Sequence, residues 1–376
     1  MINILLGDVG GTKIRLELCK YDPMTDTKVL TKKENYKTPE YKSLAEVLTV
    51  FFTSIEKGDY PTEACIAMCG PVLNNNIIKM HNTRWINVNG DELALQFSIN
   101  NFLLINDFQA VGFAHKTFNE SNLVQLNRNA DMNQKGTLML IGFGTGMGVS
   151  CVNEYNDYSG NPRTKVLSSE ASSTPLGIKN KFDFLYQQFI RKQYKLAVNR
   201  AASIELLIGT RSVPYMYEFF RLIHQHQSGF KFENKDSHPL DAEVFKINIG
   251  KLQVNEPKDI IEKFKEGDVI AIHTIKYFLE LLGNAIFTLC VAYLPTGGVI
   301  LMGQFLLELY NSFGDQKNQY TDLLTHNFLL DSFLRERFSN AKISLYMHKH
   351  EPELQGALNY IKKKIVKPNK VKLNNE

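Results

Sequence analysis

INILLGDVGGTKIRLEL, residues 2–18, opens the chain with an apolar run, a glycine turn and a second run in which apolar residues alternate. Residues 2–7 are almost wholly apolar, which is typical of a short buried strand. After the turn, Ile14, Leu16 and Leu18 alternate with polar partners, which is the period of a strand. The segment therefore predicts strand, glycine turn and strand, in that order.

The turn itself, Gly7-Asp8-Val9-Gly10-Gly11-Thr12-Lys13, carries groups that suit a phosphate. Adjacent glycines adopt torsions that are closed to other residues, and they let backbone N–H groups approach a phosphate without side-chain interference. Asp8 can hold a hydrated Mg²⁺, and Thr12 can donate a hydroxyl. The turn is not a P-loop, because it lacks G-x-x-x-x-G-K-[ST] and a strand follows it. Taken alone, the motif leaves a plain tight hairpin open as the alternative.

A second glycine turn spans residues 142–148, Gly-Phe-Gly-Thr-Gly-Met-Gly, between predicted strands at 137–141 and 149–152. Glycine at alternate positions weakens strand structure, so a simple hairpin would not need it. The turn fails the Rossmann fingerprint at Met147, and a strand follows it instead of a helix. We therefore favour a phosphate-binding hairpin over dinucleotide binding, with a bulged barrel corner as the alternative. Two such turns indicate two related halves.

Asn106 and Asp107 follow a predicted strand at 102–105, ahead of a helix predicted from Ala110 onward. In open α/β sheets, ligands bind beyond the carboxyl ends of strands. A carboxylate there can accept a proton from an attacking hydroxyl, and Asn106 can orient it. The alternative is that Asp107 caps the next helix. The two glycine turns favour the role of base.

Glu170 and Glu205 are further candidates, because carboxylates bind the hydroxyl pairs of a sugar through charge-assisted hydrogen bonds. By spacing alone, each is a surface or capping residue. Asn82 and Trp85, in His-Asn-Thr-Arg-Trp at 81–85, are similar cases, and the single Trp reads by itself as a core residue.

The remaining elements are predicted from periodicity and from glycine and proline breaks. We expect helices at 42–56, at 178–225 with a break near 209–214, and at 257–293 as two helices around Gly267-Asp268; strands at 64–68, 298–302 and 343–347; and a surface loop at 226–247.

Composition points to a soluble intracellular enzyme. The 376 residues exceed one compact core and predict two domains, with 44% apolar and 22% charged residues and a net charge of +4. Scattered basic residues argue against nucleic-acid binding. Five cysteines without a CxxC pair argue against a disulfide framework or a zinc site. We expect no signal peptide, no bilayer-spanning segment and a cytoplasmic location.

The motifs together resemble bacterial-type glucokinases, a group within the actin/hexokinase/Hsp70 ATPase superfamily. GDVGGTK, GPV at 70–72, HNTRW, LINDF at 104–108, GFGTGMGVS and GGVILMG at 297–303 stand in the order of that family. The resemblance implies an α/β fold of two actin-like (ribonuclease H-like) lobes, with a mixed sheet in each lobe and a cleft between them. It implies a small domain at 1–108, completed by a C-terminal helix at about 352–376, and a large domain at 109–351.

The resemblance also implies ATP-dependent phosphorylation of glucose at its 6-hydroxyl, giving glucose 6-phosphate and ADP, the entry step of glycolysis. ATP and Mg²⁺ are the implied cofactors, and a homodimer is the implied assembly. The implied roles are catalytic base for Asp107; glucose binding for Asn82, Asn106, Asp107, Glu170, Ser173 and Glu205; ATP binding for Asp8, Gly10, Gly11, Thr12, Gly144, Thr145, Gly146 and Gly303; and a largely water-mediated Mg²⁺ contact for Asp8.

Three features depart from the bacterial pattern. Ser173 stands where bacterial members carry histidine, and the Glu170–Ser173 spacing is similar to the trypanosomatid branch. Gly303-Gln304 replaces the usual Gly-Gly of the turn on the adenosine side. The loop at 226–247 is longer than in bacterial forms.

Two rival functions remain to be weighed. A sugar-sensing regulator would usually carry a DNA-binding helix-turn-helix ahead of this fold, whereas this sequence starts at the first strand and retains Asp107. An actin- or Hsp70-like ATPase would not need Glu170 and Glu205 beside Asn106-Asp107, which favour a polyol acceptor.

Overall fold

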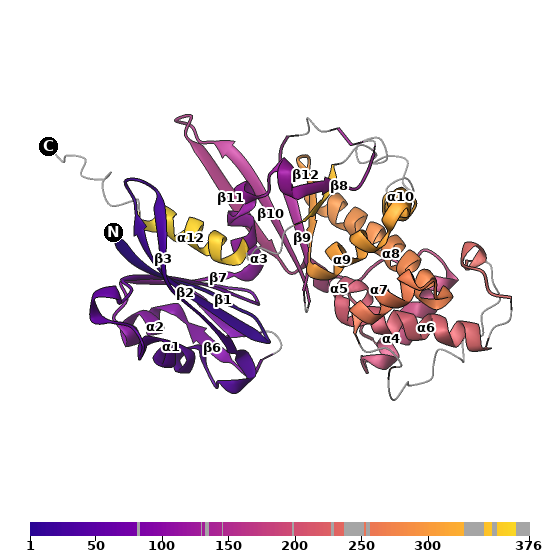
Figure 1. Ribbon diagram of the computed structural model, residues 1–376, viewed down its shortest axis with the longest axis horizontal. Helices are drawn as coiled ribbons and strands as arrows, with labels where there is room; N and C mark the ends of the chain where they lie inside the picture. The colour runs from indigo at the N-terminus through magenta and orange to yellow at the C-terminus, as the bar shows by residue number, and fades with distance from the viewer. Residues whose placement is uncertain are drawn as a thin grey trace. The chain divides into compact units, whose positions relative to one another are not determined.

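The computed structural model describes residues 1–80, 83–128, 130–131, 135–144, 146–197, 199–226, 229–236, 252, 256–326, 342–347 and 352–365. The chain divides into two compact α/β units (Figure 1). Unit 1 comprises Met1–Asn119, Tyr155–Ser168 and His350–Glu376, and unit 2 comprises Glu120–Glu154 and Ser169–Lys349. Unit 1 continues past residue 108, and the domain boundaries given by the family resemblance stay a prediction.

The sheet of unit 1 has the strand order β3-β2-β1-β4-β7. Strands β1 to β3 are antiparallel neighbours, whereas β4 and β7 run parallel to β1. The strands are β1 (Ile2–Val9), β2 (Lys13–Asp22), β3 (Thr27–Lys37), β4 (Glu63–Met68) and β7 (Asn101–Asn106), and a separate ribbon is formed by β5 (Asn76–Lys79) and β6 (Ile86–Asn89). The predicted opening of strand, glycine turn and strand is confirmed.

Helices cover both faces of this sheet (Figure 1). One face packs against α1 (Leu44–Phe52) and α2 (Gly90–Phe97), and the other against α3 (Asp107–Phe113) and α12 (Pro352–Ile365). Along β1, Leu5 belongs to the first core, whereas Ile4 and Leu6 belong to the second. A strand covered on both faces needs apolar residues at successive positions, which explains the apolar run at 2–7.

The second sheet repeats the strand order of the first and adds β8 at one edge, antiparallel to β13. Its order is β11-β10-β9-β12-β13-β8, with β9 antiparallel to β10 and parallel to β12, and β12 parallel to β13. Its strands are β8 (Leu123–Gln125), β9 (Leu138–Phe143), β10 (Met147–Asn156), β11 (Pro162–Ser169), β12 (Gly298–Met302) and β13 (Ile343–Tyr346). The two related halves expected from the glycine turns are therefore confirmed in the strand order.

The helices of unit 2 surround one large apolar core. In the described part of this unit they are α4 (Lys181–Gln193), α5 (Ile204–Ile208), α6 (Val213–His226), α7 (Pro257–Lys265), α8 (Val269–Tyr293), α9 (Gln304–Ser312) and α10 (Lys317–His326). The predicted break at Gly267-Asp268 is confirmed: Gly267 has a φ of +83°, and Asp268 caps α8 by accepting a hydrogen bond from Ala271 N.

Helix α8 is long and apolar enough, by length and composition, to cross a bilayer. However, 67% of its most apolar window is buried inside the protein. Its buried residues include Phe278, Leu282 and Ile286, which belong to the core of unit 2. The burial therefore makes α8 a core helix of this unit.

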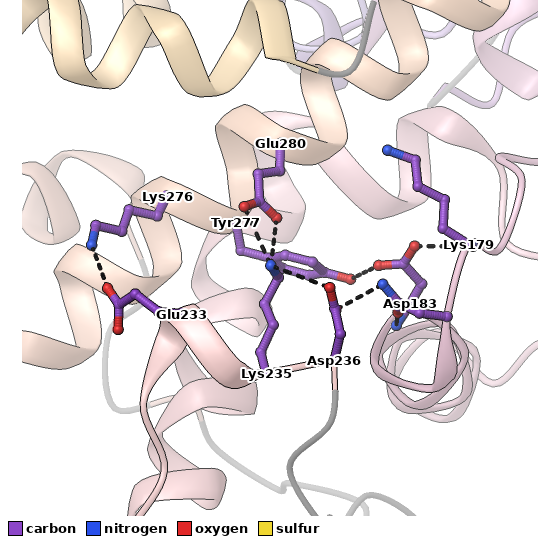
Figure 2. Close-up of polar contacts among 9 residues, drawn as sticks. Lys179, Asp183, Glu233, Lys235, Asp236, Lys276, Tyr277 and Glu280 are labelled. Atoms are coloured by element: carbon purple, nitrogen blue, oxygen red, sulfur yellow. Dashed lines mark hydrogen bonds and ion pairs between the residues drawn. The ribbon is translucent and has the colours of Figure 1, made fainter. Parts of the chain in front are cut away.

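Part of the segment that we expected to be a surface loop packs onto the core of unit 2. Phe230 and Phe232 are buried in that core. Lys235 Nζ lies 3.1 Å from Glu280 Oε2, in the polar network of Figure 2. The surface-loop interpretation therefore missed the burial of Phe230 and Phe232, whereas most of the residues around them are exposed, as expected of a surface loop. Residues 227–228 and 237–247 lie outside the described part.

Candidate active site

The first glycine turn is held by its own hairpin and by the segment after β3. Gly10 N donates to Lys13 O at 2.9 Å. Thr38 N donates to Thr12 O at 3.1 Å, and Thr38 Oγ1 donates to Gly10 O at 2.7 Å. The exposed Thr12 therefore belongs to a turn fixed at both ends, and Thr38 is a supporting residue that the sequence did not reveal.

Neither this turn nor its counterpart needs glycine for its backbone conformation. Among the described residues, Gly10, Gly11, Gly144 and Gly146 do not have a left-handed φ. A Cβ at Gly10 would meet only Lys13 O at 3.5 Å, and a Cβ at Gly144 would meet nothing within 4 Å. The torsional argument for glycine was therefore wrong at these positions. What glycine provides at Gly10 and Gly144 is open space above the backbone.

Asp8 is a buried carboxylate next to the first turn. Its Oδ2 accepts a hydrogen bond from Arg15 Nη2, and the strand register places Arg15 directly opposite Asp8. The same Nη2 lies 3.5 Å from Glu353 Oε2 at the start of α12. The pKa of Glu353 is raised to about 8 by burial and by the negative charge of Asp8, with a smaller contribution from Asp107.

Asn106 ends β7 and caps α3. Its Oδ1 accepts a hydrogen bond from Gln109 N at 3.0 Å, and its Nδ2 donates to Gly70 O at 3.1 Å. Helix α3 starts at Asp107 and not at Ala110, so the predicted helix start was three residues late. The alternative in which Asp107 caps the helix is wrong, because Asn106 takes that position.

Asp107 occupies the first turn of α3, half-buried, with its Oδ1 accepting from Phe108 N at 2.8 Å. The parallel registers pair Val9 with Met68 and Met68 with Asn106. The glycine turn after β1 and Asp107 after β7 therefore lie at the same edge of the sheet, which is the edge where ligands of such sheets bind.

A pocket of about 480 Å³ adjoins the first turn within unit 1. It is lined by Gly11, Thr38, Pro39, Tyr41, Thr83, Arg84 and Trp85. Trp85 is buried, and its indole Nε1 donates to Tyr41 O at 3.0 Å, so it is also the core residue that the isolated motif suggested. Asn82 lies outside the described residues.

The second glycine turn is tighter than predicted. Gly142 and Gly148 are paired strand residues, so the turn itself spans only residues 144–146. Gly144 N donates to Gly146 O at 2.9 Å, and Thr210 Oγ1 donates to Gly144 O. Thr145 lies outside the described residues.

Unit 2 brings Glu205 to this turn. A Cβ at Gly146 would lie 2.9 Å from Glu205 Oε1. Ile204 N donates to Thr174 O at 2.8 Å, which joins the start of α5 to the segment that carries Ser173. Glu170 lies in the same short segment, since its carbonyl oxygen accepts from Ser173 N at 2.9 Å. The predicted acids and Ser173 therefore belong to adjoining segments of one unit, with Glu170 and Ser173 exposed.

Gly303 is required by the fold. It has a φ of +141°, and a Cβ there would lie 2.3 Å from Phe143 O. Gln304 begins α9. The close approach of β12 to β9 thus accounts for glycine at this position without a nucleotide.

The described residues contain no group of three His, Cys, Asp or Glu side chains that could hold a metal ion. Asp8 offers a single carboxylate, and Arg15 already contacts it. This donor set does not fit a tightly bound ion, but it fits a hydrated Mg²⁺ that arrives with a nucleotide and keeps most of its waters.

The sequence model of the glucokinase family matches residues 5–327. A glucokinase of Synechocystis is 26% identical over 314 residues, covering 80% of this chain and 83% of the relative. Among solved structures, the glucokinase of Balamuthia mandrillaris in complex with glucose aligns with a TM-score of 0.71 at 18% identity, covering 96% of this chain and 94% of that chain. The Leishmania braziliensis glucokinase aligns with a TM-score of 0.69 at 17% identity, covering 96% and 93%. The structural matches establish the two-lobed actin-like ATPase fold, and the sequence match establishes the family. The chain therefore belongs to the glucokinase family of sugar kinases.

Proposed function

We propose that this chain phosphorylates glucose at its 6-hydroxyl with ATP, with Asp107 as the general base. Family membership supports the reaction. The observation that carries the assignment of Asp107 is that Asn106, and not Asp107, caps α3. The carboxylate therefore stands in the first turn of α3, at the ligand-binding edge of the sheet, where its Oδ1 accepts a hydrogen bond from Phe108 N.

In this reaction, the carboxylate of Asp107 accepts the proton of the 6-hydroxyl as that oxygen forms a bond to the γ-phosphorus of ATP. The bond between the γ-phosphorus and the bridging oxygen breaks, and ADP leaves with that electron pair. Backbone N–H groups of the two glycine turns, other than those of Gly10 and Gly144 that bond within their own hairpins, are assigned to the phosphate oxygens, where they stabilise negative charge. The open space above Gly10 and Gly144 supports this assignment.

Glucose binding is assigned to Asn82, Asn106, Glu170, Ser173 and Glu205. Asn106 uses one lone pair and one N–H in the protein, so its amide retains one acceptor and one donor site for a hydroxyl. Glu205, beside the second turn, presents a carboxylate that can accept from a pair of hydroxyls.

Nucleotide binding is assigned to Asp8, Gly10, Gly11, Thr12, Gly144, Thr145, Gly146 and Gly303. Mg²⁺ would be held through water by Asp8, and it would neutralise charge on the transferred phosphoryl group. The contribution of Gly303 is confined to backbone shape, because its lack of a side chain is already explained by Phe143. A homodimer in the cytoplasm is our prediction from the family resemblance, and light scattering on the purified protein tests the dimer.

A coupled assay over glucose, mannose, fructose, galactose and glucosamine tests the function. Turnover of glucose is expected, with loss of turnover in Asp107→Asn. A protein that binds glucose, as measured by calorimetry, but transfers phosphate to no hexose would instead be a sugar sensor, and the enzyme assignment would be wrong.

A further inference from the structure

We propose that Glu353 is a positioning residue for Asp8, and that it acts through Arg15. The proposal rests on the proposed function, in which Asp8 faces the hydrated metal ion of the nucleotide. Glu353 lies 338 positions after Arg15 in the sequence, and nothing in the first glycine motif points to it.

Arg15 links the two carboxylates. Its Nη2 donates to Asp8 Oδ2 and lies 3.5 Å from Glu353 Oε2. The side chains of Arg15, Asp8 and Glu353 are 21%, 12% and 22% exposed, so water screens these charges only in part. Partial exclusion of water strengthens electrostatic interactions between the three groups.

The position of Glu353 is fixed by the docking of α12. Gly356 packs against the carbonyl oxygen of Ala110 in α3. One turn further along, Asn359 Nδ2 donates to Phe113 O at 2.9 Å, and the rings of Phe113 and Tyr360 pack at 5.1 Å. A helix held at these points presents its first turn, with Glu353, at a defined place beside Arg15.

The arrangement divides the charge of one guanidinium between two carboxylates. If Asp8 were the sole acceptor, Arg15 would neutralise most of its charge. When it is ionised, Glu353 draws part of that positive charge away and restrains the rotamer of Arg15, so that Asp8 retains a negative potential toward a dication. Without the charge of Glu353, the neighbourhood of Asp8 becomes more positive.

This mechanism predicts different effects on nucleotide binding with and without a metal ion, whereas a loss of packing would affect both alike. In Glu353→Gln, binding of a metal–nucleotide complex weakens. Binding of the same nucleotide without metal, which carries two more negative charges, stays equal or tightens. We expect a weakening of about 3- to 10-fold for the metal complex, at or below the lower end of effects seen when residues that orient a metal ligand are changed.

Calorimetry on the full chain measures the affinity for β,γ-imido-ATP under two conditions. One titration contains Mn²⁺ and gives the affinity for the metal complex, and the other contains EDTA and gives the affinity for the metal-free nucleotide. The measurement is made at about pH 8.5, above the pKa of about 8 for Glu353, so that the wild-type carboxylate is largely ionised. Lys362→Met is the matched control: it removes the ion pair of Lys362 with Asp26, 2.6 Å, from the same helix without approaching Asp8. It is expected to bind both nucleotide forms as the wild type does.

Arg15→Gln completes the test as the background for a double variant. Because Glu353 acts mainly through Arg15, Glu353→Gln is expected to cause a much smaller loss of metal–nucleotide affinity in that background than in the wild type. Equal loss with and without metal would show a structural role, and unchanged affinities would exclude any role; either result overturns the proposal. A wild-type protein that phosphorylates no hexose would instead contradict the proposed function, which the binding experiment does not measure.

Discussion

Gly356 of α12 lies against the carbonyl oxygen of Ala110 in α3, so closely that a Cβ at position 356 would stand 1.7 Å from that oxygen. Helix α3 carries Asp107 at its first residue, and α12 carries Glu353 in its first turn. This backbone contact therefore joins the C-terminal helix to the elements that hold the proposed base and the neighbour of Arg15.

Gly356→Ala is expected to destabilise unit 1, because the contact is with backbone and the helices must move apart. A loss of about 1–3 kcal/mol or more in the free energy of unfolding is expected from overpacking, together with reduced turnover. Urea unfolding measures the first effect. Gly58→Ala is the control, since a Cβ at Gly58 would meet nothing within 4 Å; equal stability of the two variants would contradict the helix contact.

Gly144→Ala is expected to fold normally and to lose nucleotide binding. A methyl group at this position meets no protein atom within 4 Å, so the fold tolerates it. It would occupy the space assigned to a phosphate, so the KM for ATP should rise, by about 10-fold for a loss of 1.4 kcal/mol, whereas the KM for glucose should change little. Steady-state kinetics and thermal unfolding together measure these effects.

Gly303→Ala is the opposite case in the same unit. Its φ of +141° and the approach of Phe143 O to 2.3 Å make any side chain costly. We expect a marked loss of thermal stability before any specific change in the KM for ATP. If Gly303→Ala were as stable as Gly144→Ala, our distinction between structural and ligand-related glycines would fail.

Substitutions of Asp107 and of its neighbour Asn106 are expected to have different effects, the first mainly on catalysis and the second on stability. Asp107→Ala should lower kcat by about 10²- to 10⁴-fold, the usual contribution of a general base, with little effect on unfolding. Asn106→Ala removes the cap of α3 and should lower stability by about 1 kcal/mol. Wild-type kcat in Asp107→Ala would refute the assignment of the base.

The pair of the half-buried His224 and the buried His273 is expected to make stability sensitive to acid. His224 Nε2 and His273 Nδ1 are 3.0 Å apart, an arrangement in which one of the two nitrogens must lack a proton. Burial lowers the pKa of His224, and burial together with the neighbouring His224 and Lys276 lowers the pKa of His273 to about 4. Glu233 opposes this shift at His273, and Asp268 opposes it at His224, both more weakly.

The unfolded chain binds protons at these histidines near pH 6.5, whereas the folded chain does so only at lower pH. Their contribution to stability is therefore fully present above about pH 6.5 and is lost as the pH falls toward 4. Other buried acids titrate in the same range, so the free energy of unfolding of the wild type is compared with that of His273→Gln at each pH. The difference between the two free energies should shrink by about 2–3 kcal/mol over that range. His226→Gln, at an exposed position, should show no such change; a pH-independent difference for His273→Gln would contradict the argument.

Residue pattern predicted the elements that depend on local periodicity. The strands on either side of both glycine turns, the division of 257–293 at Gly267-Asp268 and the strand before Asn106 all agree with the structure. The position of Arg15 opposite Asp8 could also have been predicted from the sequence, because a tight turn after Val9 sets this hairpin register. In segment 229–236 the burial of Phe230 and Phe232 was missed, because polar residues surround them in the sequence and both rings pack against His273 of α8.

By itself, the sequence determined the family and the order of strand, turn and strand, because these depend on neighbours a few residues apart. Tertiary structure decided which residues surround Asp8 and which glycines are required by the fold. Glu353 reaches Arg15 from 338 positions away because α12 docks on α3, and Gly303 is needed because β12 lies against β9. Contacts of this kind are set by packing between distant segments, and no local pattern encodes them.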